Sequence, residues 1–343
     1  MAARKRRAFP SVPNVLSFLT VLSFLSLSCL LASCSTGAPA RSIAEAGETP
    51  VEMADMLSIT DDLGRTVTVP QKPERVAVLL GSFTDVWVLA GGLDTLAAAA
   101  DDAWTSFDLP LGENVRNLGG VFHLNLEELL AAEPDLILAS CDTTVDTELL
   151  PTFEKLGIPA LYFEVQSFAD YLRMLDICTQ ITGHRENYAQ YGEAVGEQVD
   201  AALAMEDGTA PSVLCLRAGG TSVRAKGSEG TVLGEMLSAL GCRNIADGNH
   251  SILEDLSLEA ILAEDPDFIF LVYQGSSQKD AEKAVRETLE SNPAWGTLRA
   301  VREGRVYVMD RGLYHFKPNA RWGDAYEQLA RILYGWTDTG ETV

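Results

Sequence analysis

One short segment near the C-terminus gathers most of the side chains suited to holding a ligand. It runs from Arg311 to Trp322 and reads RGLYHFKPNARW. Aromatic faces stack on a flat organic ligand, and lysine and arginine neutralise an anionic one. The segment therefore predicts a site for an anionic ligand with a catecholate or macrocyclic face. Its candidate contacts are Tyr314, His315, Lys317, Arg321 and Trp322.

Several of these residues also have a simpler interpretation. Trp322 begins a helical run through Tyr326 and Leu329, so it could pack in the core. His315 could be an ordinary loop histidine, and Arg321 could pair with one of the many acids. An adjacent tyrosine and histidine can also hold haem iron, so that role stays open for Tyr314 and His315.

A second group of candidates follows apolar runs that are predicted to be strands. Trp104, Arg217 and Tyr273 stand at or just beyond the ends of such runs. In open α/β sheets ligands bind outside the carboxyl ends of strands, which makes these residues candidate ligand contacts. Arg224 and Lys226 lie in a polar, Gly/Ser-rich segment and are secondary candidates for the same cleft.

Motifs of catalysis and of metal binding are missing from the sequence. It contains no G-x-S-x-G element, no phosphate-binding Walker loop and no paired-histidine zinc motif. The four histidines fit no metal-ligand spacing. We therefore predict no catalytic residue, no protein-bound metal site, no resident cofactor and no enzymatic activity.

The cysteines argue against a metal cluster. Cys141, Cys178, Cys215 and Cys242 are widely separated and show no C-x-x-C spacing. Cys215 and Cys242 would form a disulfide if they met in space. The alternative is that they are small buried apolar residues.

The N-terminus has the organisation of an export signal. Four basic residues, Arg4 to Arg7, precede an apolar run from Val15 to Ser33. The run ends in Leu-Ala-Ser before Cys34, which resembles the lipobox of bacterial lipoproteins. We therefore predict a signal peptide over 1–33, a lipid anchor on Cys34 and a flexible tether over 34–57. An uncleaved membrane anchor is the alternative.

The charge of the chain restricts its partners. The formal net charge is −23, and removal of the four basic residues of the signal would leave −27. Nucleic-acid phosphates would be repelled, so a nucleic-acid partner is excluded. Broad contact with anionic lipid is disfavoured as well. We expect contact with the membrane through the lipid anchor only, on the extracytoplasmic face.

An internal repeat predicts the architecture. Residues 124–140 read LNLEELLAAEPDLILAS and residues 256–272 read LSLEAILAEDPDFIFLV, with eight of seventeen positions identical. Each copy has a capping residue, a short helix ended near a proline, and an apolar run typical of a buried strand. Upstream of each copy, a helix headed by an acid is expected, over 85–91 and over 235–241. The chain is thus predicted to form two similar lobes.

The remaining strand candidates alternate with helical segments, which favours an α/β fold with mainly parallel sheets. We place the N-terminal lobe at 58–166 and the C-terminal lobe at 207–343. The connector over 167–206 has helical composition, and its second half would form a long helix. A single stiff helix between two lobes predicts a small opening and closing motion.

Four stretches in this order resemble the extracytoplasmic substrate-binding proteins of ABC importers for iron–siderophores, haem and cobalamin. They lie at 61–79, 125–138, 257–271 and 292–310. The resemblance implies two α/β lobes joined by one backbone helix, a ligand between the lobes and the importer's permease subunits as partners.

The same resemblance implies that one carboxylate per lobe pairs with arginines of the permease. The matching residues are Asp85 and Glu235, although glutamate is more usual than aspartate at the first position. Stabilisation of a helix N-terminus would explain either acid without a partner.

We therefore expect a carrier of a small-molecule metal chelate, with a ferric siderophore as the leading ligand. Haem and cobalamin are the alternatives on the same type of transporter. An enzyme on the same fold and a signalling lipoprotein are two further hypotheses, and the missing cysteine cluster disfavours the first of them.

Overall fold

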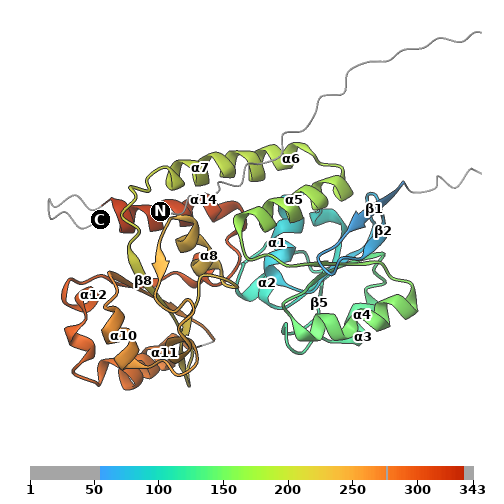
Figure 1. Cartoon of the computed structure of the whole chain (residues 1–343). Coiled ribbons are helices and arrows are strands. Elements are labelled where there is room, and N and C mark those ends of the chain that lie inside the picture. The colour runs from blue at the N-terminus through green and yellow to red at the C-terminus, as the bar shows by residue number, and fades with distance from the viewer. Residues whose placement is uncertain (1–54, 276, 336–343) are drawn as a thin grey trace, which may run out of the picture. The chain divides into compact units, whose positions relative to one another are not determined.

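Two five-stranded sheets, one from each half of the chain, form the framework of the molecule (Figure 1). The structure is a computed structural model that describes residues 55–275 and 277–335. The predicted signal peptide, Cys34 and most of the tether lie outside the described residues. No helix among the described residues is long and apolar enough to cross a membrane.

The N-terminal sheet has the order β5-β4-β3-β6-β7, and all its strands are parallel. An antiparallel hairpin of β1 (Met56–Thr60) and β2 (Thr66–Pro70) precedes it. The strands are β3 (Val76–Val78), β4 (Leu96–Ala99), β5 (Arg116–Asn117), β6 (Leu136–Ser140) and β7 (Ala160–Phe163). The helices are α1 (Gly81–Leu89), η1 (Leu93–Thr95), α2 (Asp102–Thr105), α3 (Leu126–Ala131) and α4 (Thr144–Leu156).

The C-terminal sheet has the order β10-β8-β11-β12, and β9 pairs with β8 in the antiparallel sense. Its strands are β8 (Ser212–Ala218), β9 (Val223–Lys226), β10 (Arg243–Asn244), β11 (Phe268–Tyr273) and β12 (Val306–Met309). The helices up to η3 are α8 (Val232–Ala239), α9 (His250–Leu253), α10 (Leu258–Glu264), α11 (Gln278–Val285) and η3 (Arg286–Glu290). The later ones are η4 (Trp295–Thr297), α12 (Arg299–Arg302), α13 (Arg311–Tyr314), η5 (Asn319–Arg321) and α14 (Trp322–Tyr334). The predicted fold class, two α/β lobes with mainly parallel sheets, is confirmed.

The internal repeat corresponds to equivalent units in the two lobes. Asn125 caps α3 by accepting from the backbone N–H groups of Glu127 and Glu128. Ser257 caps α10 by accepting from the N–H of Ala260. Each helix leads into a central strand with an almost wholly buried sequence, β6 and β11. The predicted caps, helices and buried strands are confirmed.

Helices connect the two lobes. Helix α5 (Phe168–Thr182) begins at a capping box formed by Ser167 and Asp170 and ends at Gly183, which has a φ of 82°. A nearly continuous helix follows, made of α6 (Glu186–Tyr188), a π-helical turn η2 (Ala189–Glu193) and α7 (Ala194–Leu203). Its length of roughly 27 Å follows from a rise of about 1.5 Å per residue. The last helix, α14, lies along α7 (Figure 1).

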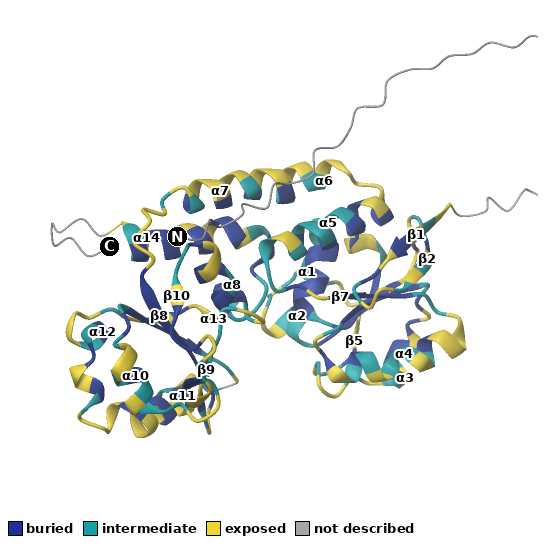
Figure 2. Ribbon diagram, in the orientation of Figure 1, coloured by how far each residue is buried: buried dark blue, intermediate teal, exposed yellow. Residues whose placement is uncertain are grey.

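One hydrophobic cluster spans the two lobes, and each lobe has a further cluster of its own. A single cluster of buried residues includes Trp87 of α1, Phe163 of β7, Phe270 of β11 and Trp322 of α14. Figure 2 shows the buried residues along the sheets and on the inner sides of α1, α5, α7 and α14. Because this cluster continues from one lobe into the other, each lobe contributes to the stability of the other.

The predicted place of Asp85 at the head of its helix was wrong. Helix α1 begins at Gly81, so Asp85 lies in its second turn and does not head the helix. Glu235 does lie in the first turn of α8.

The structure decides whether Cys215 and Cys242 can form a disulfide. The pairing of β10 with β8 sets Arg243 opposite Ser212, which places Cys242 beside Pro211. Cys215 is four residues further along β8, or roughly 13 Å at about 3.3 Å per residue, so these two free cysteines cannot form a disulfide without backbone movement.

Candidate ligand-binding cleft

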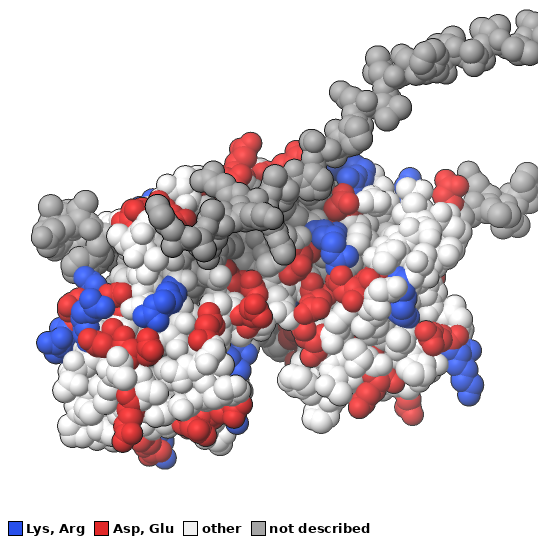
Figure 3. Space-filling model, viewed as in Figure 1, with Lys and Arg blue, Asp and Glu red and all other residues white. Residues whose placement is uncertain are grey.

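Loops that follow strands of both lobes meet across the space between the lobes. Phe316, which follows β12, lies 5.7 Å from Phe107 between ring centroids. Lys317 lies 3.9 Å from a carboxylate oxygen of Asp142, which follows β6. Figure 3 shows a hollow between the lobes, with basic side chains at the edge formed by the C-terminal lobe. These contacts bring together loops at the carboxyl ends of strands from both lobes, where open α/β sheets bind ligands.

The C-terminal lobe gathers cations at this edge, and we call them the basic cluster: Arg217, Arg224, Lys226, Arg311 and Lys317. The register of β8 and β9 sets Arg217 directly opposite Arg224 and sets Lys226 opposite Cys215. Because side chains alternate along a strand, these three cations project from the same face of the hairpin.

Like charges directly opposite each other in a sheet repel. Within the described part of the chain, no carboxylate forms an ion pair with Arg217, Arg224 or Lys226. Burial, with the neighbouring charges of Arg217 and Arg224, lowers the pKa of Lys226, and burial lowers that of Arg217. The hairpin thus presents positive charge that the protein does not compensate.

His315 lies within the basic cluster. Its ring stacks on Phe316 at 5.5 Å, and its buried Nδ1 atom has no hydrogen-bond partner. Burial and then the charges of Arg217, Arg311, Lys317 and Lys226 lower the pKa of His315 to about 4. The imidazole is therefore neutral near pH 7.

The opposite side of the cleft, on the N-terminal lobe, is acidic. The side-chain amide of Gln166 donates to Asp142 at 3.3 Å and to Glu164 at 3.0 Å. Burial lowers the pKa of Lys317 even though Asp142 opposes that effect. Lys317 is thus the cation of the cluster that faces an acid of the other lobe.

The structure places two predicted aromatic contacts in the protein interior. Tyr314 is only 1% exposed, and its hydroxyl donates to the carbonyl of Ala325 at 3.0 Å and lies 2.8 Å from Oε1 of Gln328. Trp322 is fully buried and packs against Phe168 and Tyr326. Neither side chain is accessible to a ligand in this structure, because α13 and α14 turn these rings toward the shared core.

Three other candidates have contacts or charged neighbours outside the basic cluster. Tyr273 ends β11 on the sheet face covered by α11, where its charged neighbours are Glu282, Glu290 and Arg286. Arg321 is 60% exposed and lies 3.5 Å from Asp324. Trp104 of α2 is half-buried against the shared core. Of the predicted ligand contacts, the structure brings together Arg217, His315 and Lys317.

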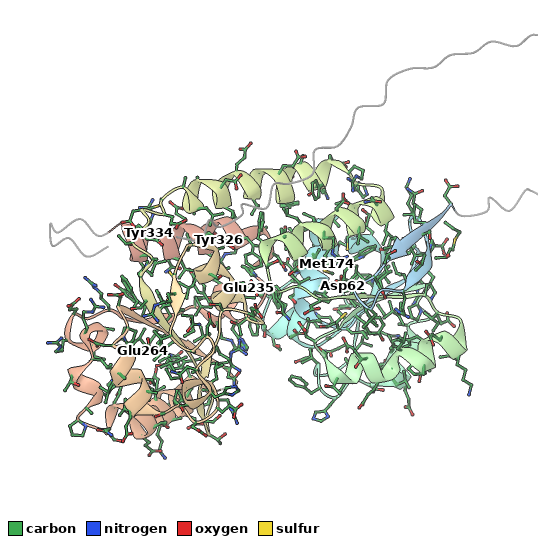
Figure 4. All side chains as sticks on the ribbon, viewed as in Figure 1. Asp62, Met174, Glu235, Glu264, Tyr326 and Tyr334 are labelled. Carbon is green, nitrogen blue, oxygen red and sulfur yellow. The ribbon has the colours of Figure 1, made fainter. Side chains whose placement is uncertain are left out.

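The two predicted docking acids, Asp85 and Glu235, are partly buried by neighbouring residues. The side-chain amide of Asn319 donates to Asp85 and to the carbonyl of Ser82, both at 2.8 Å. Burial raises the pKa of Asp85. Burial is also the main cause that raises the pKa of Glu235, which lies at the junction of the lobes in Figure 4.

Sequence reasoning did not predict the contacts that Phe107 and Asn319 make between the lobes. The loops that hold them were predicted from strand ends, but nothing in their residue types points to these partners. Asn319 has a left-handed φ of 53° and is fully buried, which only the tertiary structure reveals.

The described residues contain no cluster of His, Cys, Asp or Glu that would hold a metal ion. A pocket of about 310 Å³ lies near the amino ends of the C-terminal strands, lined by Asp207, Asp267, Arg305 and Tyr334 among others. It shares no residue with the basic cluster, and we do not assign the ligand to it.

Comparison with known proteins gives one family and several relatives. A model of the family described as "Periplasmic binding protein" matches residues 76–312. The Fe(3+)-citrate-binding protein YfmC of Bacillus subtilis (strain 168) is 26% identical over 302 residues, covering 85% of this chain and 89% of YfmC. The uncharacterized ABC transporter substrate-binding lipoprotein YvrC of the same organism is 22% identical over 284 residues, covering 81% of this chain and 85% of YvrC.

Among solved structures, the periplasmic heme-binding protein RhuT from Roseiflexus sp. RS-1 in apo form superposes with a TM-score of 0.62. It is 21% identical and covers 76% of this chain and 98% of RhuT. At that identity the likeness shows a shared fold.

Proposed function

Because the chain belongs to the periplasmic binding protein family, we propose that it captures an anionic ferric chelate between its lobes and delivers it to an ABC importer. The observation that carries the proposal is the set of hairpin cations in the basic cluster, Arg217, Arg224 and Lys226, which pair with no carboxylate of the described residues in a chain with a net charge of −23. Positive charge focused in one cleft of an acidic protein attracts an anion. The printed names of YfmC and YvrC support a ferric carboxylate and an ABC transporter respectively.

The contents of the cleft favour a carboxylate-rich chelate over haem or cobalamin. Tyr314 and Trp322, which could have stacked on a macrocycle, are buried in the core. Arg217, Arg224 and Lys226 offer charge-assisted hydrogen bonds to carboxylates. Haem and cobalamin remain the alternative ligands within the same transporter type.

We propose a lipid anchor on Cys34, which the residues of the lipobox and the lipoprotein name of YvrC support. Fractionation of a Cys34→Ala variant tests the anchor, because the variant should leave the membrane fraction. Asp85 and Glu235 are our candidates for contact with the permease.

Titration of tryptophan fluorescence against ferric citrate, other ferric siderophores, haemin and cobalamin tests the ligand class. We expect an anionic ferric chelate to quench at the lowest concentration. The Arg217→Ala variant should bind that chelate about tenfold more weakly or worse, since a hydrogen bond to a charged group contributes roughly 1.5 kcal/mol or more.

Arg243→Ala is the matched control, because Arg243 pairs with Glu264 at 3.1 Å outside the basic cluster. Its affinity should equal that of the wild type. Tight binding of haemin or cobalamin with no response to ferric chelates would contradict the proposed ligand class. Equal affinity of the Arg217→Ala variant and the wild type would move the site away from the basic cluster.

A further inference from the structure

His315 is surrounded by positive charge that comes from several elements. Arg217 approaches from β8, Lys226 from β9, Arg311 from α13, and Lys317 from the following loop. Arg311 also lies over the ring of Phe316 at 4.6 Å, which fixes it beside the stacked imidazole. The acids that face Lys317, Asp142 and Glu164, belong to the N-terminal lobe, and among the described residues no carboxylate pairs with the imidazole ring.

The empty site is therefore unfavourable for an imidazolium ion. Protonation would add a fifth positive charge to four existing ones, and burial would remove part of its hydration. The buried Nδ1 atom has no acceptor that would stabilise an added proton. These conditions keep the ring neutral as long as the cleft holds no anion.

An anionic ligand changes these conditions at the same place. Negative charge bound by Arg217 and Lys226 lies next to the imidazole and compensates the field of the basic cluster. We propose that His315 takes up a proton when an anionic ligand binds among these cations, so that capture of the ligand is linked to proton uptake. This inference rests on the function proposed above.

The direction of the pH dependence follows from the empty state. The pKa of His315 is about 4 in the empty protein, against an ordinary value of 6.5, and bound negative charge raises it. The loaded protein then binds more protons than the empty one, so affinity rises as pH falls from the pKa of His315 in the loaded state toward about 4, its pKa in the empty state. Each unit of pKa increase is about a tenfold gain in affinity at the acidic end of this range.

Calorimetry with ferric citrate as the probe tests the inference. Titrations near pH 5 in two buffers with different ionisation enthalpies give the number of protons taken up on binding. We expect net uptake by the wild type and less uptake by the His315→Asn variant. Protonation of ferric citrate itself is the same for both proteins and cancels in the comparison.

His250→Asn is the matched control, because the His250 side chain is 87% exposed and pairs with Glu254 at 3.1 Å. It should take up the same number of protons as the wild type. Equal proton uptake by the His315→Asn variant and the wild type would refute the inference. Tighter binding with rising pH that depends on His315 would also refute it, and would indicate direct coordination of iron by the imidazole.

A second measurement does not depend on the folding of a variant. Nuclear magnetic resonance of the histidine ring signals, with diamagnetic gallium(III) citrate in place of the ferric chelate, gives the pKa of His315 in each state. We expect a higher value in the loaded protein, and an equal or lower value would overturn the proposal. If no chelate of the wider panel binds, the proposed function itself fails, whereas binding without a change at His315 rejects only this inference.

Discussion

Two acids shape the loops of the N-terminal lobe: Asp146, which is fully buried, and Asp102, which is half-buried. Asp146 accepts a hydrogen bond from the N–H of Ser140 at 2.8 Å, and Asp102 accepts one from the N–H of Gly81 at the same distance. The second oxygen of Asp146 is buried and has no partner. Burial, the largest cause in each case, raises the pKa of Asp146 to about 7 and that of Asp102 to about 6.

Asp146 should therefore make stability depend on pH. Its pKa is raised on folding, so its contribution is fully present below the ordinary value of 3.8 and is lost as pH rises toward about 7. The Asp146→Asn variant keeps an oxygen for the N–H of Ser140 and cannot ionise. Relative to the wild type, its free energy of unfolding should improve by roughly 1 kcal/mol per pH unit across this window.

Urea denaturation of both proteins at several pH values between 4 and 7 measures this difference. Contributions of Asp102 and His315 occur in both proteins and largely cancel. Parallel pH profiles would show that folding does not raise the pKa of the Asp146 carboxyl group.

At the scale of elements, the sequence predicted the helices and strands whose positions are set by local residue patterns. The period of the repeat and its caps located α3, α10, β6 and β11, because capping and burial leave a mark in residue types. The start of α1 was missed, since Leu80 offers no side-chain cap. The N–H of Gly81 is satisfied instead by Asp102, which is 21 positions away in the sequence.

The candidate site was predictable only in part for the same reason. Strand ends pointed to Arg217 and to the loop that carries His315 and Lys317. The burial of Tyr314 and Trp322 depends on how α13 and α14 pack on the shared core, which no short-range pattern reveals.

The cap of α10 gives a test of the repeat. In the Ser257→Ala variant the N–H of Ala260 loses its acceptor, and the free energy of unfolding should fall by about 1 kcal/mol. Urea denaturation measures the loss. Ser251→Ala is the control for the same substitution at an exposed position of α9 and should change stability much less. Equal losses in the two variants would show that the hydroxyl of Ser257 does not stabilise the helix.

At the scale of the whole molecule, the segment after β12 joins ligand binding to contact between the lobes. Lys317 and His315 belong to the proposed site, while Phe316 meets Phe107 and Asn319 meets Asp85 of the other lobe. The shared hydrophobic core and the helical connector restrict the lobes further. A ligand that moves this segment would therefore also change the surroundings of Asp85.

Delivery to the importer can be tested with charge-neutral variants of the two candidate docking acids. Asp85→Asn keeps an oxygen for the amide of Asn319, and Glu235→Gln keeps one for the N–H of Gly230. The double variant should bind the ferric chelate as the wild type does. Uptake by cells should fall roughly tenfold or more, because a charge-assisted contact contributes about 1.5 kcal/mol or more.

The single variants should differ, because Asp85 must leave Asn319 before it can reach an arginine of the permease. We therefore expect Glu235→Gln to reduce uptake more than Asp85→Asn does. Glu264→Gln, an exposed acid of the C-terminal lobe that pairs with Arg243, is the control and should transport normally. Normal uptake by the double variant would exclude both acids from the permease contact, and weaker chelate binding would assign them to the contact between the lobes instead.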